Sequence, residues 1–472
     1  MKNKLFYLIS VACFLSYTST FTSCVNGVDD EYLEQKLDGS ENNKKGEELP
    51  DLNGDYSIEG DFDLEMICNG EVLEGKKVIL TVDEKNETAS FTFAAAQTDL
   101  ETVIATSIPG GMGGLVSGWG LKYTGNSPVP GVKEIIVANV SLYRNGPDYY
   151  IFEGENKGET YDMTFKGNID GDKMTVNVNY ELKNQKLAGT WDLADVYDEN
   201  HNDNSPEFSP LWLDWDSNVN VDLGKLKIEV IPGFASEFPV NGSMNGLFNM
   251  ATSKTLSPTI MKLLIGVNIG IEPLIKNMLQ SVTAESNGNM YAIYSYSNDF
   301  TKPEWSGPEG MPHNYMRYFY DREKPDEKIY IEVNPSILIS LIKSLAATAT
   351  RSTRADLRDV AKELIASLVP ILEDGIPCEY KLEGDNMTIN IDGVVMRDIL
   401  IKLMVVLNDP DVQSVLEGPL SSLGDQKEMV YKLIKNLPYA LKYHDGDNES
   451  NYTGECKYVK IGLKLVKAKA AN

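Results

Sequence analysis

Two stretches far apart in the chain have nearly the same sequence, and they decide the expected fold. Residues 171–178 read GDKMTVNV and residues 384–391 read GDNMTINI, with five of the eight positions identical. In both, a Gly-Asp pair precedes a run in which Met, Val or Ile alternates with polar residues. The pair is typical of a tight turn, and the alternation is typical of a strand with one buried face. We therefore expect a β-hairpin at each stretch.

Two weaker similarities occur in the same order along the chain. Residues 52–56 (LNGDY) parallel residues 187–191 (LAGTW), because each has a Leu, a Gly two positions later and an aromatic residue two further on. Residues 149–153 (YYIFE) resemble residues 328–333 (KIYIEV). The shared order favours an internal duplication. The alternative is that good turn-and-strand sequences simply converge.

The first region, residues 51–187, carries mostly strand signals. Short alternating runs are separated by turn residues, and an Asn69-Gly70 pair is a favoured two-residue hairpin turn. The expected strands cover residues 55–59, 61–66, 77–82, 89–93, 135–142, 149–153, 161–166 and 173–182. A meander of this kind buries one face and tends to close into an antiparallel barrel.

The second region, residues 188–472, keeps the strand signals and adds helical ones. Residues 257–282 begin with Ser-Pro, which is typical of a helix start, and Pro273 should kink or split this helix. Further helices are expected over residues 336–350, 356–372, 394–407 and 425–441, with a closing strand over 452–466. We expect an α+β domain, and the sequence leaves open whether it is a second barrel with helical insertions.

The composition excludes several classes of protein. The chain has 472 residues and a formal net charge of −27, so it would repel nucleic acid. A hydrophobic content of 42% allows a sizeable core. Three His and five Cys argue against a metalloprotein rich in these ligands.

The N-terminus reads as a targeting segment. Lys2 and Lys4 precede an apolar run over residues 5–15, and a small residue stands before Cys24. This arrangement resembles the lipobox of bacterial lipoproteins, which implies that residues 1–23 are a signal peptide and that Cys24 is lipidated. The chain would then be attached to a membrane through a lipid anchor. An ordinary cleaved signal peptide and a buried apolar strand are the alternatives.

The residues after Cys24 are polar and acidic. Residues 24–50 show almost no apolar periodicity and are expected to form a flexible tether. The acidic cluster at 29–31 resembles the surface-export signal of Bacteroidetes lipoproteins. It implies an outer-membrane lipoprotein exposed at the cell surface, with the periplasmic face as the alternative.

A Gly-x-aromatic first strand, a meander and a Gly-Asp-x-Met strand together resemble the calycin-like, or lipocalin-like, β-barrel domains of secreted Bacteroidetes lipoproteins. The resemblance covers residues 51–187 and the strands of residues 188–472. The whole chain also resembles an uncharacterised Bacteroides lipoprotein family. The resemblance implies a barrel whose interior holds one small, often apolar, ligand.

The sequence contains no catalytic or cofactor-binding signature. His201, His313 and His444 each lie in a polar, loop-like stretch, and the chain has no nucleophile elbow, H-E-x-x-H, P-loop or G-x-G-x-x-G motif. We therefore expect a non-enzymatic protein without a cofactor. A glycan hydrolase that uses paired carboxylates stays open, because 70 acidic residues offer many pairs.

Aromatic residues of the second region are candidates for ligand binding. Flat rings beside polar side chains suit stacking against sugars, although ordinary core packing produces the same pattern. The candidates are Trp305, Tyr315, Tyr318, Tyr320, Trp212 and Trp215.

One acidic loop is a candidate calcium site. Asp195, Asp198, Glu199 and Asp203 supply hard oxygen ligands, but their spacing matches no EF-hand loop. A solvated surface loop is the alternative.

Cys378 and Cys456 each open a strand-like run, so these two residues could pair as a disulfide on neighbouring strands. The alternative is that they are separate buried thiols, as is Cys68.

The leading hypothesis is therefore a lipid-anchored envelope protein that binds a small molecule or glycan through its second region. The alternatives are an accessory module that docks onto another envelope protein through its helices, and a carboxylate-dependent glycan hydrolase.

Overall fold

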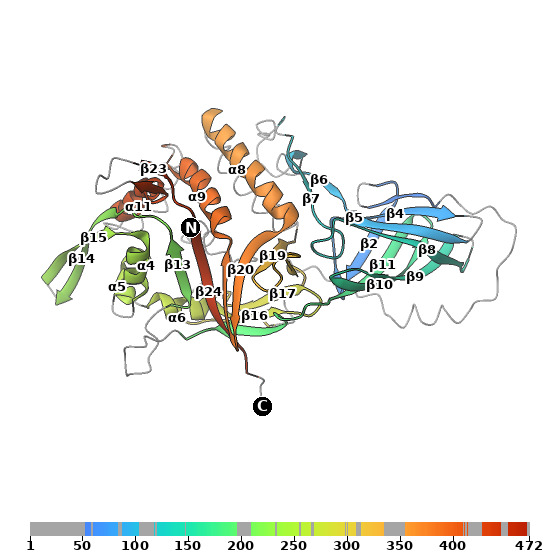
Figure 1. Cartoon of the computed structure of the whole chain (residues 1–472), viewed down its shortest axis with the longest axis horizontal. Coiled ribbons are helices and arrows are strands. Elements are labelled where there is room, and N and C mark those ends of the chain that lie inside the picture. Colours follow the sequence, from blue (N-terminus) through green and yellow to red (C-terminus); the bar gives the residue numbers. More distant parts are fainter. Residues whose placement is uncertain are drawn as a thin grey trace.

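The chain forms two β-structures that lie side by side along the long axis of the molecule (Figure 1). This is seen in a computed structural model. The structure describes residues 52–469, except residues 58–59, 84–86, 103–117, 119, 147, 196–208, 232–233, 254–255, 266–268, 298, 300, 308–312, 335–354, 409, 411–412, 414–426 and 445–451.

The first region is one curled sheet of nine strands. Its strands are β1 (Gly54–Tyr56), β2 (Asp63–Cys68), β3 (Glu71–Val72), β4 (Lys76–Asp83), β5 (Thr88–Ala95), β8 (Glu134–Arg144), β9 (Tyr149–Lys157), β10 (Tyr161–Asp170) and β11 (Lys173–Leu182). They lie in the order β1-β4-β5-β8-β9-β10-β11-β2-β3. A short side hairpin joins β6 (Gln97–Asp99) to β7 (Lys122–Thr124). The expected strands of this region are confirmed.

Aromatic side chains fill the concave side of this sheet. Phe91 lies between Phe152 and Phe165, with ring centroids 4.5 and 5.5 Å away. Gly154 and Gly167 make this packing possible, because a Cβ on either residue would lie less than 3 Å from a Phe ring. The interior of the first region is thus occupied by its own side chains.

The second region contains a closed antiparallel barrel of eight strands. They are β12 (Gly189–Leu193), β16 (Leu279–Ala284), β17 (Asn289–Tyr294), β18 (Met316–Tyr320), β19 (Lys328–Val333), β20 (Ile376–Glu383), β21 (Asn386–Ile391) and β24 (Val459–Lys467). The ring closes because β24 pairs with β21 on one side and with β12 on the other. A ninth strand, β13 (Leu211–Trp215), extends from β24.

The closed barrel therefore lies in the second region, where the sequence left a barrel with helical insertions open. The barrel expected in the first region is a curled sheet instead. In the first region the place of β24 is taken by β2, which runs parallel to β11. Within the described residues, β1 meets the chain before β2 at a single bridge, Tyr56 to Phe62, instead of a ladder. A single bridge does not complete the hydrogen-bonded ring, so this sheet stays open.

The similar sequence stretches occupy equivalent strands. Both sheets begin with seven meandering strands: β1-β4-β5-β8-β9-β10-β11 and β12-β16-β17-β18-β19-β20-β21. The LNGDY and LAGTW stretches form the first strand of each. The Gly-Asp pairs form the two-residue turns between the sixth and seventh strands, and Gly171 and Gly384 both have a φ of 62°. This correspondence favours the duplication over chance convergence.

The insertions of the second region all attach to one end of its barrel. They are α4 (Met244–Thr252), α5 (Ser257–Ile265), α6 (Ile271–Met278), α8 (Ala355–Asp374), α9 (Gly393–Leu407) and α11 (Lys427–Ala440), with the hairpins β14 (Val221–Ile231)–β15 (Phe234–Gly242) and β22 (Lys442–His444)–β23 (Tyr452–Glu455). These helices and hairpins connect β12 to β16, β19 to β20 and β21 to β24. We call this the helical end, and the opposite end, with the β16–β17, β18–β19 and β20–β21 turns, the hairpin end.

Most of the expected helices are confirmed, with one correction. The helix expected over residues 257–282 is two helices, α5 and α6, and its last part is strand β16. Pro273 lies in the first turn of α6, where a missing N–H costs nothing. The helix expected at 336–350 lies outside the described residues.

The two regions share one hydrophobic cluster, which contains side chains of both sheets. Backbone and side-chain hydrogen bonds cross between them, for example from Leu182 N–H to Ser286 O and from Asn314 Nδ2 to Val72 O, at 3.0 and 2.8 Å. A second cluster lies between β13, β24 and the helices α4, α9 and α11.

Candidate functional site

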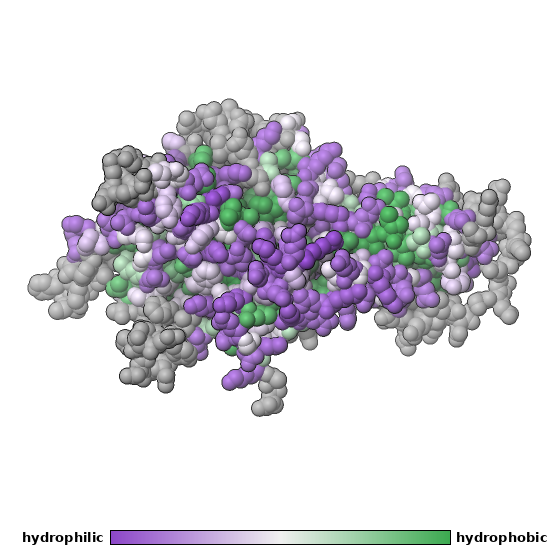
Figure 2. Space-filling model, viewed as in Figure 1, coloured by the Kyte–Doolittle hydropathy of each residue, from purple (hydrophilic) through white to green (hydrophobic). Residues whose placement is uncertain are grey.

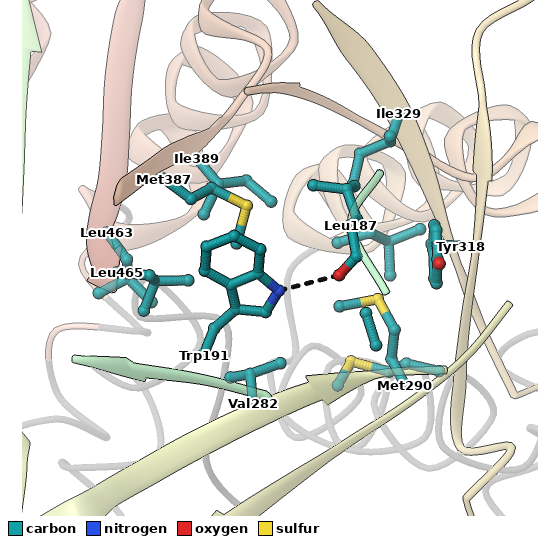
Figure 3. A pocket seen from close by; sticks show the side chains of 13 residues that line it. Leu187, Trp191, Val282, Met290, Tyr318, Ile329, Met387, Ile389, Leu463 and Leu465 are labelled. Carbon is teal, nitrogen blue, oxygen red and sulfur yellow. Dashed lines mark hydrogen bonds between the residues drawn. The ribbon is translucent and has the colours of Figure 1, made fainter. Parts of the chain in front are cut away.

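The barrel of the second region encloses a cavity of about 60 Å³ (Figure 3). It lies among inward-facing side chains of seven strands and of the chain just before β12. They are Leu187, Trp191, Val282, Ala284, Met290, Met316, Tyr318, Ile329, Ile331, Met387, Ile389, Leu463 and Leu465. These residues alternate with outward-facing polar ones because neighbouring residues of a strand point to opposite faces.

The polar atoms of the lining residues are bonded within the protein. Trp191 donates a hydrogen bond from Nε1 to the carbonyl oxygen of Leu187 at 2.9 Å (Figure 3). The Tyr318 hydroxyl donates to the carbonyl oxygen of Glu285 at 2.9 Å, and burial raises the pKa of this phenol. The surface facing the cavity is apolar. The site therefore favours apolar groups, because a polar ligand would lose its hydrogen bonds to water and form none with the cavity wall.

The size of the cavity limits what fits without rearrangement. A cavity of about 60 Å³ exceeds the space that one water needs and is smaller than the roughly 150 Å³ of an apolar cavity known to bind benzene. Met290, Met316 and Met387 lie in the wall, and the unbranched Met side chain adapts readily to new neighbours. The cavity suits a short alkyl group as it stands and a larger apolar group once these side chains turn.

The cavity is least shielded at the helical end of the barrel. Ile331, near the end of β19, and Met316, at the start of β18, are half-buried. Towards the hairpin end, Trp191, Tyr318 and Leu465 are no more than 3% exposed. An apolar ligand would therefore approach from the helical end.

The structure separates the six predicted aromatic residues. Tyr318 lines the cavity, and Tyr320 lies beside it with its hydroxyl accepting a hydrogen bond from Leu187 N–H at 2.9 Å. Tyr315 and Trp305 are half-buried outside the cavity, and Trp305 forms an isolated bridge with Ser295.

The other two predicted aromatics lie on β13, outside the barrel. Trp212 packs against Gly462 of β24, where a Cβ would lie 2.7 Å from its indole. Trp215 belongs to the second hydrophobic cluster and donates from Nε1 to Ala440 O at 2.7 Å. Trp212 is half-buried and Trp215 lies in the core, and their odd spacing places them on opposite faces of β13. The six predicted aromatic residues, all of them described, therefore do not gather into a common surface for sugars.

Sequence reasoning missed Trp191 and the three methionines as lining residues. Trp191 is the aromatic residue of the LAGTW stretch, which marked the first strand but carried no sign of a cavity. Alternation shows which residues point inward, but it does not show whether their volumes fill the space.

Of the four acidic residues in the predicted calcium loop, the structure describes one, Asp195. Asp195 forms an ion pair with Lys276, which also pairs with Glu272 at 2.6 Å. Asp198, Glu199 and Asp203 lie outside the described residues. In the part of the chain that the structure describes, no three His, Cys, Asp or Glu side chains gather as metal ligands.

Cys378 and Cys456 are free thiols that belong to different hydrophobic clusters, so the structure does not join them. Burial raises the pKa of Cys378 to about 12 and that of Cys456 to about 11. Both are therefore protonated and unreactive near neutral pH. Cys24 lies outside the described residues.

No protein-family model, curated protein or solved structure matches this chain. Among the described residues, no helix is long and apolar enough to cross a bilayer.

Proposed function

We propose that this protein is a non-enzymatic, lipid-anchored protein of the bacterial cell envelope that binds a small apolar ligand inside the barrel of its second region. The anchor rests on the lipobox-like sequence before Cys24 and the acidic residues after it. The binding site rests on one observation: the barrel encloses an apolar cavity whose nearby polar atoms, those of Trp191 and Tyr318, are bonded to the protein itself.

The chemistry of the cavity favours alkyl or small ring groups over sugars. A sugar hydroxyl inside the cavity would lose its hydrogen bonds to water and gain none, at a cost of roughly 1–3 kcal/mol for each group. A methylene group gains about 0.8 kcal/mol on burial. The glycan part of the original expectation therefore receives no support from this site, and no carboxylate lines the cavity to serve a hydrolase.

The docking alternative is less well supported by the helices that the structure describes. Val394 and Val405 of α9 are 48% and 55% exposed, but the exposed Asp398 and Lys402 stand between them along that helix. Figure 2 shows apolar residues in small separate groups on the face in view, with hydrophilic residues between them. Such scattered groups are ordinary for a protein surface.

Quenching of Trp191 fluorescence by short 1-bromoalkanes tests the proposal. A bromine atom within contact distance quenches an indole, so the purified full chain should lose fluorescence in a saturable way. The Trp191→Phe variant should lose that saturable part. Ala284→Ile should block it by filling the cavity, while Thr388→Val, which faces outward on β21, should leave it unchanged. Quenching that does not saturate, or that persists in Trp191→Phe, would refute binding in the barrel.

A further inference from the structure

A buried cluster of charges lies where the first region covers the outside of the barrel. Arg317 of β18 and Glu332 of β19 follow inward-facing neighbours and point outward, towards the first region. Lys76 reaches them from β4. The side chains of all three are at most 4% exposed, so the cluster is closed to solvent.

Both oxygens of the single carboxylate in the cluster, that of Glu332, have partners. Glu332 Oε1 lies 2.7 Å from Arg317 Nη2 and 3.5 Å from Lys76 Nζ, and Oε2 accepts a hydrogen bond from Asn126 Nδ2 at 3.3 Å. Lys76 Nζ also donates to the backbone carbonyl oxygen of Asn126 at 2.8 Å, and Arg317 Nη1 donates to the backbone carbonyl oxygen of Pro128. Each cation thus also donates to one neutral carbonyl oxygen.

The cluster therefore holds one positive charge in excess. Two cations face one carboxylate, and burying an uncompensated charge is costly. Burial lowers the pKa of Lys76 to about 8, which shows how poorly this site tolerates the second cation.

Two phenolic hydroxyls supply a second, independent sign of an occupant. Tyr123 and Tyr180 are each 2% exposed, and among the described residues neither hydroxyl has a hydrogen-bond partner. The Tyr123 hydroxyl interacts electrostatically with Glu332 and Arg317. The Tyr180 hydroxyl lies close to Arg317, but a guanidinium group can only donate to it, so the hydroxyl hydrogen of Tyr180 has no acceptor among the described residues. A buried O–H group without an acceptor is rare and unfavourable.

We propose that a water-sized monovalent anion of the halide class binds in this cluster, between Arg317, Lys76 and the hydroxyls of Tyr123 and Tyr180. Such an anion accepts hydrogen bonds from both hydroxyls and neutralises the excess charge. A water molecule would satisfy the hydroxyls and leave the charge uncompensated. Because Lys76 and Arg317 belong to different regions, the anion stabilises the junction between the two β-structures.

Thermal unfolding of the full chain at pH 7 tests the proposal. Chloride replaces isethionate at constant ionic strength, so general screening stays the same. Between 1 and 200 mM chloride the unfolding temperature should rise by roughly 3 °C and level off, as expected for one site. Lys76→Met removes the excess charge and should abolish most of this rise. An identical response in both proteins, or no chloride response in the natural chain, would overturn the proposal.

A crystallographic measurement guards against a Lys76→Met variant that fails to fold. Crystals of the natural chain are soaked in sodium bromide, and data are collected at the bromine absorption edge. An anomalous peak within hydrogen-bond distance of Arg317 and of the Tyr123 or Tyr180 hydroxyl is expected. Water density without an anomalous signal at that place would contradict the anion and leave the hydroxyls solvated.

Discussion

Trp191 donates its indole hydrogen bond to the carbonyl oxygen of Leu187, four residues earlier, at 2.9 Å. In the first region, the Tyr56 hydroxyl donates a hydrogen bond to the carbonyl oxygen of Leu52, also four residues earlier, at 3.0 Å. In both sheets, the same contact thus joins the aromatic residue of the first strand to a Leu that precedes the strand. In the barrel it also keeps the indole nitrogen bonded to the protein, which leaves the cavity wall apolar.

Removing either hydrogen bond should destabilise the protein. Tyr56→Phe and Trp191→Phe each leave a buried carbonyl oxygen without its donor, at a cost of roughly 1–3 kcal/mol. Trp191→Phe should cost more because it also enlarges the cavity. Thermal unfolding of the two variants beside the natural chain measures this, and unchanged unfolding temperatures would mean that the contacts contribute nothing.

The two Gly-Asp turns should respond alike to substitution. Gly171 and Gly384 have a φ of 62°, and no other atom lies within 4 Å of the place of a Cβ. Gly171→Ala and Gly384→Ala should therefore each cost roughly 1 kcal/mol through backbone strain alone. Gly242→Ala is the matched control, since it has equal space and no positive φ. A cost as large at Gly242 would show that strain is not the cause.

Filling the cavity should stabilise the barrel. Ala284 lines it, and Ala284→Val places two methyl groups there. At about 24 cal/mol per Å³, filling a cavity of about 60 Å³ would gain ~1.4 kcal/mol at most. Denaturant unfolding measures it. A loss of stability would indicate that the wall cannot accept extra atoms.

The charge cluster predicts an order among its own variants. Glu332→Gln leaves Lys76 and Arg317 without a countercharge and should cost roughly 3–5 kcal/mol. Lys76→Met keeps the Arg317–Glu332 pair, which is neutral overall, so its cost should be much smaller. Unfolding free energies of the two variants decide the order. A Lys76→Met that is as damaging as Glu332→Gln would show that no excess charge exists.

The low pKa of Lys76 predicts a pH effect of a definite sign. Between about 8 and 10.5 the unfolded chain holds a proton on Lys76 that the folded chain has released. The contribution of Lys76 to the unfolding free energy therefore rises with pH in this window. Cys68, whose pKa burial raises to about 11, and Tyr180, whose pKa burial also raises, act in the opposite direction above pH 9.

Comparison with Lys76→Met isolates the lysine, because the buried thiols and phenols are present in both proteins. The natural chain should gain stability relative to the variant as the pH rises from 8 to 10. A difference that does not change with pH would contradict the depressed pKa.

Local sequence predicted the strands, the turns and several helices, since alternation, the Asn69-Gly70 and Gly-Asp pairs and apolar periodicity all act over a few residues. A closing strand was expected over residues 452–466, and its last part is β24 (Val459–Lys467). The pairing that closes the barrel was not predictable in this way. It depends on β24, which begins far beyond β21 in the chain and pairs with both β21 and β12. Residues 63–68, which take that place in the first sheet, carry the same alternating signal as any other strand.

The candidate site was harder to predict than the fold. Trp212, Trp215 and Trp305 stood out in the sequence as aromatic residues. Trp212 is half-buried against β24, however, and Trp215 lies in the second hydrophobic cluster, so they do not line a shared pocket. The cavity depends on the summed volumes of side chains from seven strands, and no single stretch of sequence reports that sum.

Xenon binding tests the central claim most directly, namely that the barrel of the second region contains an apolar cavity while the interior of the first sheet is filled by its own side chains. Diffraction from crystals under xenon pressure should show xenon among Trp191, Met290 and Met387, and none beside Phe91 in the first region. Ordered water in the barrel cavity, or no xenon there, would contradict the claim.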